Sequence, residues 1–187
     1  PEVLFHVKEK VRKESPCSDV KPETRENLRS ISPLIEKSAF RFEPVSVLVV
    51  EDSDFFAALV EETVVRSEIP LVSLRRSKNG AEAVWAVEEE MPDIVVLDWE
   101  MPGIPGTDIA RAIRRCLEFS DRYVYILMAT GKKGPDAFDE ALASGVDDYL
   151  PKPFSRNELS AKLRVGARIV SYSKCMERKR KELESYA

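Results

Sequence analysis

The stretch IVVLDWEMPG, residues 94–103, decides the fold of this 187-residue chain. Four consecutive apolar residues run into Asp98, and a second acid at Glu100 precedes a Pro-Gly turn. A short apolar run that ends in turn residues is typical of a strand buried on both faces. Such strands occur in parallel sheets covered by helices, where ligands bind beyond the carboxyl ends of the strands. Asp98 is therefore a candidate functional residue.

The same alternation of strand and helix continues on both sides of this stretch. Short apolar or β-branched runs predict strands at 45–50, 71–74, 93–98, 123–130 and 147–150. Helical spacing of apolar residues predicts helices at 53–67, 79–90, 107–118 and 136–144. A long helix is expected from Ser155, because Glu158 three residues later completes a capping-box pattern. Five such units predict a doubly wound α/β domain with a five-stranded parallel sheet.

Composition narrows the class of protein. Hydrophobic residues make up 43% of the chain, enough for a globular core, and no apolar run reaches the roughly 18 residues of a membrane span. We expect a cytoplasmic chain with no membrane partner. The three cysteines lie far apart and His6 is the single histidine, so the spacing argues against a zinc site and favours reduced thiols.

Charge is distributed unevenly along the chain. Residues 45–154 carry a net charge of −10, whereas 1–44 carry +1 and 155–187 carry +5. An acidic middle argues against direct nucleic-acid binding there and is compatible with a cation site. The basic run at 178–181 is interpreted as a solvated helix face, with contact to nucleic acid or membrane as the alternative.

Five polar side chains are expected at the carboxyl edge of the sheet. Glu51 and Asp52 follow the first strand, Asp98 ends the third, Thr130 ends the fourth and Lys152 follows the fifth. Each of them alone is also consistent with a turn or cap residue. Together, three carboxylates repel one another unless a divalent cation joins them, and oxygen ligands favour Mg²⁺. A hydroxyl and an ammonium opposite would suit a phosphoryl group, so we predict phosphoryl transfer onto Asp98.

These motifs resemble those of a known family. The stretches VLVVEDSD (47–54), IVVLDWEMPGIPG (94–106), MATG (128–131) and DDYLPKPF (147–154) are similar to the motifs of the receiver domain of two-component response regulators. The resemblance covers about 45–165 and implies a flavodoxin-like sheet of strand order 2-1-3-4-5. It also implies a sensor histidine kinase or phosphotransfer protein as partner, and no enzymatic activity beyond the domain's own phosphorylation and dephosphorylation.

The resemblance assigns roles to the acids of the edge. It implies that Asp98 is the phosphoacceptor, that Glu51 and Asp52 handle Mg²⁺ with Asp52 as the nearer ligand, and that the backbone carbonyl of Glu100 is a further ligand. Lys152 would contact the phosphoryl group. The pair is Glu-Asp rather than Asp-Asp, which keeps the charge, and the side chain of Glu100 adds another acid beside the site.

The resemblance also implies a switch. Thr130 would move to hydrogen-bond the phosphoryl oxygens and Tyr149 would turn into the vacated space; the alternative for Tyr149 is a fixed, half-buried tyrosine. The surface formed by the fourth predicted helix (136–144), the fifth strand (147–150) and the helix from Ser155 would then change, and a homodimer through that surface and the C-terminal helix is expected. The bond between Lys152 and Pro153 is expected to be cis.

The two ends are assigned as extensions. Residues 1–43 are expected to be a partly helical extension or the remains of a preceding domain, with helical patterns at 2–14 and 23–37; no pattern supports a phosphohistidine at His6. Residues 44–165 form the receiver domain, and 166–187 prolong its last helix as a linker. That helix resembles connectors to diguanylate cyclase or phosphatase output domains, which would lie beyond Ala187.

Two other functions fit parts of the pattern. An aspartate-nucleophile phosphatase also uses an acid at the end of a strand, but Glu100 stands where those enzymes usually place a second aspartate. A scaffold that is never phosphorylated usually lacks the phosphoacceptor or the lysine, and this chain has both.

Overall fold

The structure is a computed structural model that describes residues 42–118, 120–132 and 134–186. The patterns predicted at 2–14 and 23–37, together with His6, lie outside these residues. From Phe42 onward the chain forms one compact unit. Its elements are β1 (Val45–Val50), α3 (Asp54–Arg66), β2 (Leu71–Ser77), α4 (Gly80–Glu89), β3 (Ile94–Asp98), α5 (Gly106–Leu117), β4 (Tyr125–Thr130), α6 (Pro135–Ala143), β5 (Asp148–Pro151) and α7 (Arg156–Ser185).

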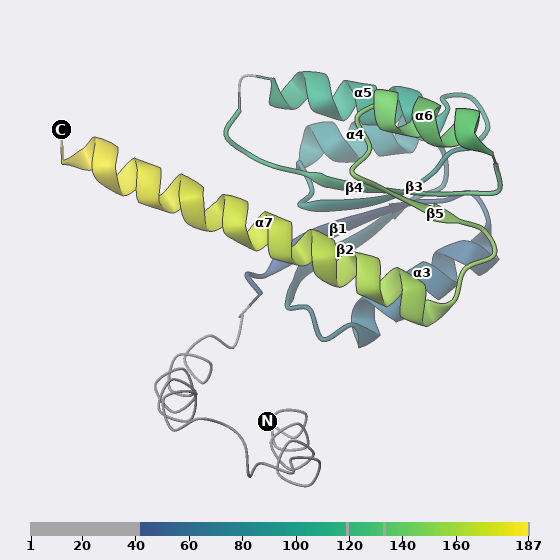
Figure 1. Cartoon of the computed structure of the whole chain (residues 1–187), viewed down its shortest axis with the longest axis horizontal. Helices are drawn as coiled ribbons and strands as arrows, with labels where there is room; N and C mark the ends of the chain where they lie inside the picture. Colours follow the sequence, from purple (N-terminus) through teal and green to yellow (C-terminus); the bar gives the residue numbers. More distant parts are fainter. Residues whose placement is uncertain (1–41, 119, 133, 187) are drawn as a thin grey trace, which may run out of the picture. The chain divides into compact units, whose positions relative to one another are not determined.

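The five strands form one parallel sheet in the order β2-β1-β3-β4-β5. Figure 1 shows α4, α5 and α6 on one face of this sheet and α3 and α7 on the other. The predicted doubly wound fold and its strand order are therefore confirmed. Within the sheet Val50 of β1 lies beside Leu97 of β3, so the residues that follow these strands emerge next to each other.

The core consists of two apolar layers separated by the sheet. On β1, Val45, Val47 and Val49 face the α3 and α7 layer, whereas Leu48 and Val50 face the layer beneath α4, α5 and α6. All residues of β1, β3 and β4 are buried, as expected for strands covered on both faces. The continuous apolar runs of the sequence thus follow from burial on both sides.

Strand β2 is longer than predicted. The sequence pattern indicated residues 71–74, but the strand continues through Ser77. Two of the added residues, Arg75 and Arg76, are charged. An edge strand tolerates them because one side of it is unpaired and their long side chains reach the surface. Arg75 donates to the carbonyls of Ala86 and Glu90 around the end of α4.

Helix α7 begins at the predicted capping box and extends for 30 residues, well past the sheet (Figure 1). Ser155 and Glu158 cap each other's backbone N–H groups, as the sequence predicted. Gly166 lets the helix approach the sheet, since a Cβ there would lie 2.3 Å from the ring of Tyr125. No helix among the described residues is both long and apolar enough to cross a membrane.

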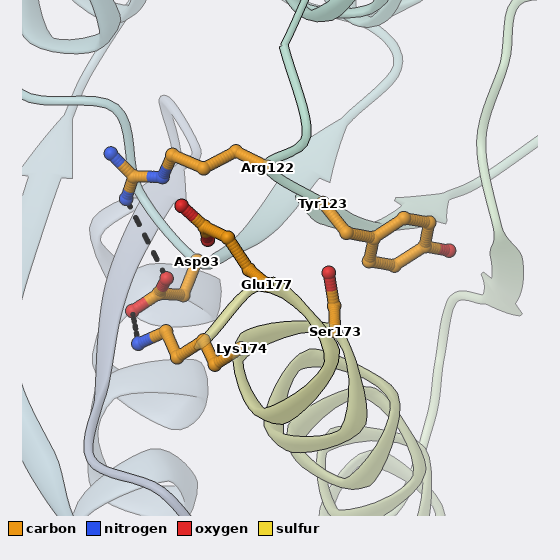
Figure 2. Close-up of a pocket in the computed structure, with 6 residues that line it drawn as sticks. All are labelled: Asp93, Arg122, Tyr123, Ser173, Lys174 and Glu177. Atoms are coloured by element: carbon orange, nitrogen blue, oxygen red, sulfur yellow. Dashed lines mark hydrogen bonds and ion pairs between the residues drawn. The ribbon is translucent and has the colours of Figure 1, made fainter. Parts of the chain in front are cut away.

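A buried carboxylate anchors α7 at the amino edge of the sheet. Figure 2 shows Arg122 and Lys174 reaching the Asp93 carboxylate from two sides, beside a hollow that Ser173 and Glu177 of α7 also line. Lys174 Nζ lies 2.7 Å from Asp93 Oδ2, and the Arg122 guanidinium lies 3.6 Å from Oδ1. The backbone N–H of Ser46 also donates to Asp93, at 2.8 Å. This cluster joins the helix to two neighbouring strands.

Candidate functional site

Three carboxylates meet at the carboxyl edge of the sheet. Asp98 is the last residue of β3, and Glu51 follows β1, where its backbone N–H donates to Ser77 of β2. One carboxylate oxygen from each of Glu51, Asp52 and Asp98 lies within 4.8 Å of the others. Glu51 and Asp98 are buried, whereas Asp52 is exposed. The cluster thus has a buried floor and one member that faces solvent.

Lys152 reaches this cluster from the loop after β5. Its Nζ lies 2.6 Å from Glu51 Oε2 and 2.9 Å from Asp98 Oδ2. The same ammonium lies 4.4 Å from the centre of the Phe56 ring. Its backbone N–H donates to the carbonyl of Thr130, and the bond to Pro153 is cis. Lys152 is therefore fixed from both its backbone and its side chain.

The charges of the cluster are not balanced. Lys152 is the one cation that the described residues bring within 4 Å of the three carboxylates, which leaves two formal negative charges. Burial raises the pKa of Glu51, and the neighbouring charge of Asp98 raises it further, while the bond from Lys152 acts in the opposite direction. This excess of negative charge is what a divalent cation would neutralise, so the donor set fits such an ion.

Thr130 lies at the end of β4, and its side chain is fully buried. The hydroxyl accepts a hydrogen bond of 3.0 Å from the backbone N–H of Lys132. Gly131 lies between them, and the Glu100 side chain is its neighbour: a Cβ added at Gly131 would lie 3.9 Å from Glu100 Oε2, an ordinary contact. The exposed Glu100 side chain thus lies over the turn after β4.

The loop after Asp98 packs closely over its own strand. A Cβ on Gly106 would lie 2.1 Å from the carbonyl oxygen of Asp98, so only glycine fits this position. The backbone N–H of Gly106 donates to the carbonyl of Trp99, at 3.0 Å. These contacts hold the start of α5 against the phosphoacceptor candidate.

Tyr149 of β5 is half-buried and points toward the loop after β4. Its hydroxyl donates to the backbone carbonyl of Lys132, and its ring meets Phe138 of α6 edge-on, with 6.0 Å between the ring centres. Lys132 Nζ lies 4.1 Å from the centre of the Trp99 ring. Lys132 thus connects Thr130, Trp99 and Tyr149.

The structure brings Glu51, Asp52, Asp98 and Lys152 together, as the sequence predicted. The roles of these residues stay predictions, as does the ligand role of the Glu100 carbonyl. Sequence reasoning missed Phe56, Trp99 and Lys132. Phe56 lies in the helix predicted at 53–67, and its spacing there does not indicate its contact with Lys152. Trp99 follows Asp98 directly, and Lys132 lies two residues after Thr130. This closeness to two predicted site residues is the signal that could have identified them.

Comparison with known proteins assigns the family. The family model described as the response regulator receiver domain matches residues 47–164. Among curated relatives, the transcriptional regulatory protein YrkP of Bacillus subtilis is 36% identical over 136 residues, which cover 73% of this chain and 54% of YrkP. The phosphate regulon transcriptional regulatory protein PhoB of Rhizobium meliloti is 31% identical, over 63% of this chain and 50% of PhoB. The chain thus spans about half the length of these two relatives.

Solved structures agree with this assignment. A DNA-binding response regulator of the LuxR family from Staphylococcus aureus is 27% identical with a TM-score of 0.55, covering 65% of this chain and 98% of that one. The chemotaxis response regulator CheY4 of Vibrio cholerae is 25% identical with a TM-score of 0.58, covering 66% and 99%. The chain therefore belongs to the response regulator receiver domain family of two-component signalling.

Proposed function

We propose that the domain is a switch that accepts a phosphoryl group on Asp98 from a histidine kinase or a phosphotransfer protein. The observation that carries this proposal is the contact between Asp98 Oδ2 and Lys152 Nζ, at 2.9 Å, within a cluster of three carboxylates that shares a single cation among the described residues. Asp98 would attack the phosphorus, and the bond from phosphorus to the donor's nitrogen would break, giving an acyl phosphate.

The residues around Asp98 suit that transfer. Lys152 is close enough to exchange a carboxylate partner for a phosphoryl oxygen, and its fixed backbone limits the reorganisation needed. Asp52 and Asp98, with Glu51 behind them, would hold Mg²⁺, and the Glu100 carbonyl would complete the protein ligands. When bound, Mg²⁺ supplies positive charge that offsets the repulsion between carboxylates and phosphoryl oxygens.

The contacts of Lys132 support a switch. Thr130 would leave its bond from the Lys132 N–H to reach a phosphoryl oxygen, and Tyr149 would lose its acceptor if the Lys132 carbonyl moved. The α6–β5–α7 surface, which contains Tyr149, would then repack. We propose that this change favours a homodimer through that surface and controls an output domain of a longer response regulator, such as a diguanylate cyclase.

Phosphate labelling tests the proposal. The full chain is incubated with a small phosphodonor and Mg²⁺, and the bound phosphate is counted by intact mass. Wild type should gain one phosphoryl group and Asp98→Asn none. Asp54→Asn is the matched control, because Asp54 is an exposed carboxylate that pairs with Arg76 instead of joining the cluster. Equal labelling of wild type and Asp98→Asn would refute the assignment, and rapid multiple turnover of a phosphate ester would favour a phosphatase.

A further inference from the structure

The ammonium of Lys152 has a third close neighbour besides its two carboxylates, the aromatic ring of Phe56. Lys152 Nζ lies 4.4 Å from the centre of that ring, 2.6 Å from Glu51 Oε2 and 2.9 Å from Asp98 Oδ2. An ammonium has three N–H groups, so two carboxylates leave one of them without a charged partner. Because the Lys152 side chain is only 11% exposed, solvent covers little of it, and the ring helps to enclose the ammonium.

Phe56 is itself held in place by the start of α3 and by aromatic neighbours. Its backbone N–H donates to Oγ of Ser53, the N-cap residue of α3. Its ring meets Phe55 edge-on, with 5.4 Å between the ring centres, and its centre lies 6.1 Å from that of Phe154. Phe154 is buried and follows Lys152 by two residues. Phe56 therefore lies beside the loop after β5 at both Lys152 and Phe154.

We propose that Phe56 is a positioning residue for phosphoryl transfer, acting through the Lys152 ammonium. A ring face attracts a cation through its quadrupole, most strongly where water is excluded. A lysine side chain has many rotamers, and its ammonium has to lie close to Asp98 when the phosphoryl group arrives. The ring holds the ammonium in that place. The inference rests on the proposed transfer to Asp98 and adds a residue that acts on it only through Lys152.

A ring suits this position better than an acid or an aliphatic side chain does. Glu51 and Asp98 already share the Lys152 ammonium, and a further negative charge would draw it away from an incoming phosphoryl group. An aliphatic side chain would exclude water but would not attract the ammonium. The difference between a ring and an aliphatic side chain is therefore the property to test.

The rate of Asp98 labelling tests the role of the ring. The full chain is mixed with a small phosphodonor and saturating Mg²⁺, and labelling is followed by intact mass. Phe56→Leu, which keeps an apolar side chain without a ring, should lower the rate constant by roughly three- to thirtyfold. Phe56→Tyr, which keeps the ring, should stay within about twofold of wild type. Equal losses in the two variants, or a wild-type rate in Phe56→Leu, would overturn the proposal.

Phe55→Leu is the matched control. Phe55 is the neighbouring residue of α3, it is 74% exposed, and among the described residues no cation lies over its ring. The same substitution there removes a ring that does not hold Lys152, so it should leave the rate constant within roughly twofold. A loss at Phe55 as large as that at Phe56 would overturn the proposal.

A double-mutant cycle tests the contact independently of labelling, by urea denaturation without phosphodonor or Mg²⁺. Lys152→Gln removes the positive charge, so Phe56→Leu should lower the urea midpoint by less in that background than in wild type. Phe56 also packs against the apolar α3 and α7 layer, and a purely apolar role predicts the same loss in both backgrounds. Equal losses would therefore overturn the proposal.

These outcomes are separable from those of the proposed function. If wild type gains no label on Asp98, the proposed transfer fails, and the urea cycle still decides whether the ring holds Lys152. If wild type is labelled and Phe56→Leu is labelled at the same rate, the transfer stands and the positioning role of Phe56 fails.

Discussion

Each edge of the sheet holds a buried carboxylate beside a lysine, but the two sites balance their charges differently. At the amino edge, Asp93 alone receives Lys174, Arg122 and the N–H of Ser46. At the carboxyl edge, three carboxylates share Lys152 as the cation that the described residues supply. A satisfied carboxylate stabilises the fold, whereas a cluster with excess negative charge costs stability and is retained where a ligand can compensate. The comparison separates an acid that anchors the fold from the acids of the proposed functional site.

The largest effect is expected from removing the amino-edge carboxylate. Asp93→Ala leaves the buried N–H of Ser46 without its side-chain acceptor and Lys174 without its partner, and it should lower the free energy of unfolding by about 2–3 kcal/mol. Urea denaturation measures the change. Asp54→Ala, which removes an exposed ion pair, should leave the free energy of unfolding nearly unchanged. A loss at Asp93 no larger than at Asp54 would remove the distinction between the two edges.

Mg²⁺ should stabilise the folded protein by binding at the carboxyl edge and not at the amino edge. At a Mg²⁺ concentration ten times its dissociation constant, the free energy of unfolding should rise by about 1.4 kcal/mol. Asp52→Asn should abolish this gain because it removes the exposed ligand, while Asp54→Asn should retain it. Thermal unfolding with Mg²⁺ or with a chelator measures both. The same gain in Asp52→Asn and wild type would place the cation elsewhere.

The smallest effect concerns pH in the absence of divalent cations. Burial raises the pKa of Glu51 above its ordinary value of 4.5, so the folded protein keeps a proton that the unfolded chain has released. The stability contribution of Glu51 therefore falls as the pH rises from that value through the raised pKa. Glu51→Gln should remove this fall in thermal midpoints recorded with a chelator. If the thermal midpoint of Glu51→Gln changed with pH in parallel with that of wild type, this explanation would be contradicted.

Most of the fold could be predicted because buried parallel strands leave continuous apolar runs. The end of β2 could not be predicted, because Arg75 and Arg76 lie on an edge strand. Their backbones pair with β1, but their side chains are charged, so the sequence shows no apolar run there. The capping box of α7 could be predicted because it depends on two residues, Ser155 and Glu158, that are three positions apart.

The site was predictable to the extent that the sheet aligns its strand ends. The acids and Lys152 each follow a recognisable strand, so topology alone brings them together. The contact of Phe56 with Lys152 and that of Lys132 with Trp99 depend on how side chains pack, which spacing does not encode. The Asp93–Lys174 pair joins residues 81 positions apart, and no local pattern marks it.

Locating the phosphoryl group tests the central claim most directly. After reaction with a small phosphodonor and Mg²⁺, the acyl phosphate is trapped chemically and the chain is digested and mapped by mass spectrometry. The label should lie on Asp98, within 94–103, in wild type and in Asp93→Asn alike, and Asp98→Asn should carry none. A label on another residue, or one that persists in folded Asp98→Asn, would contradict the account.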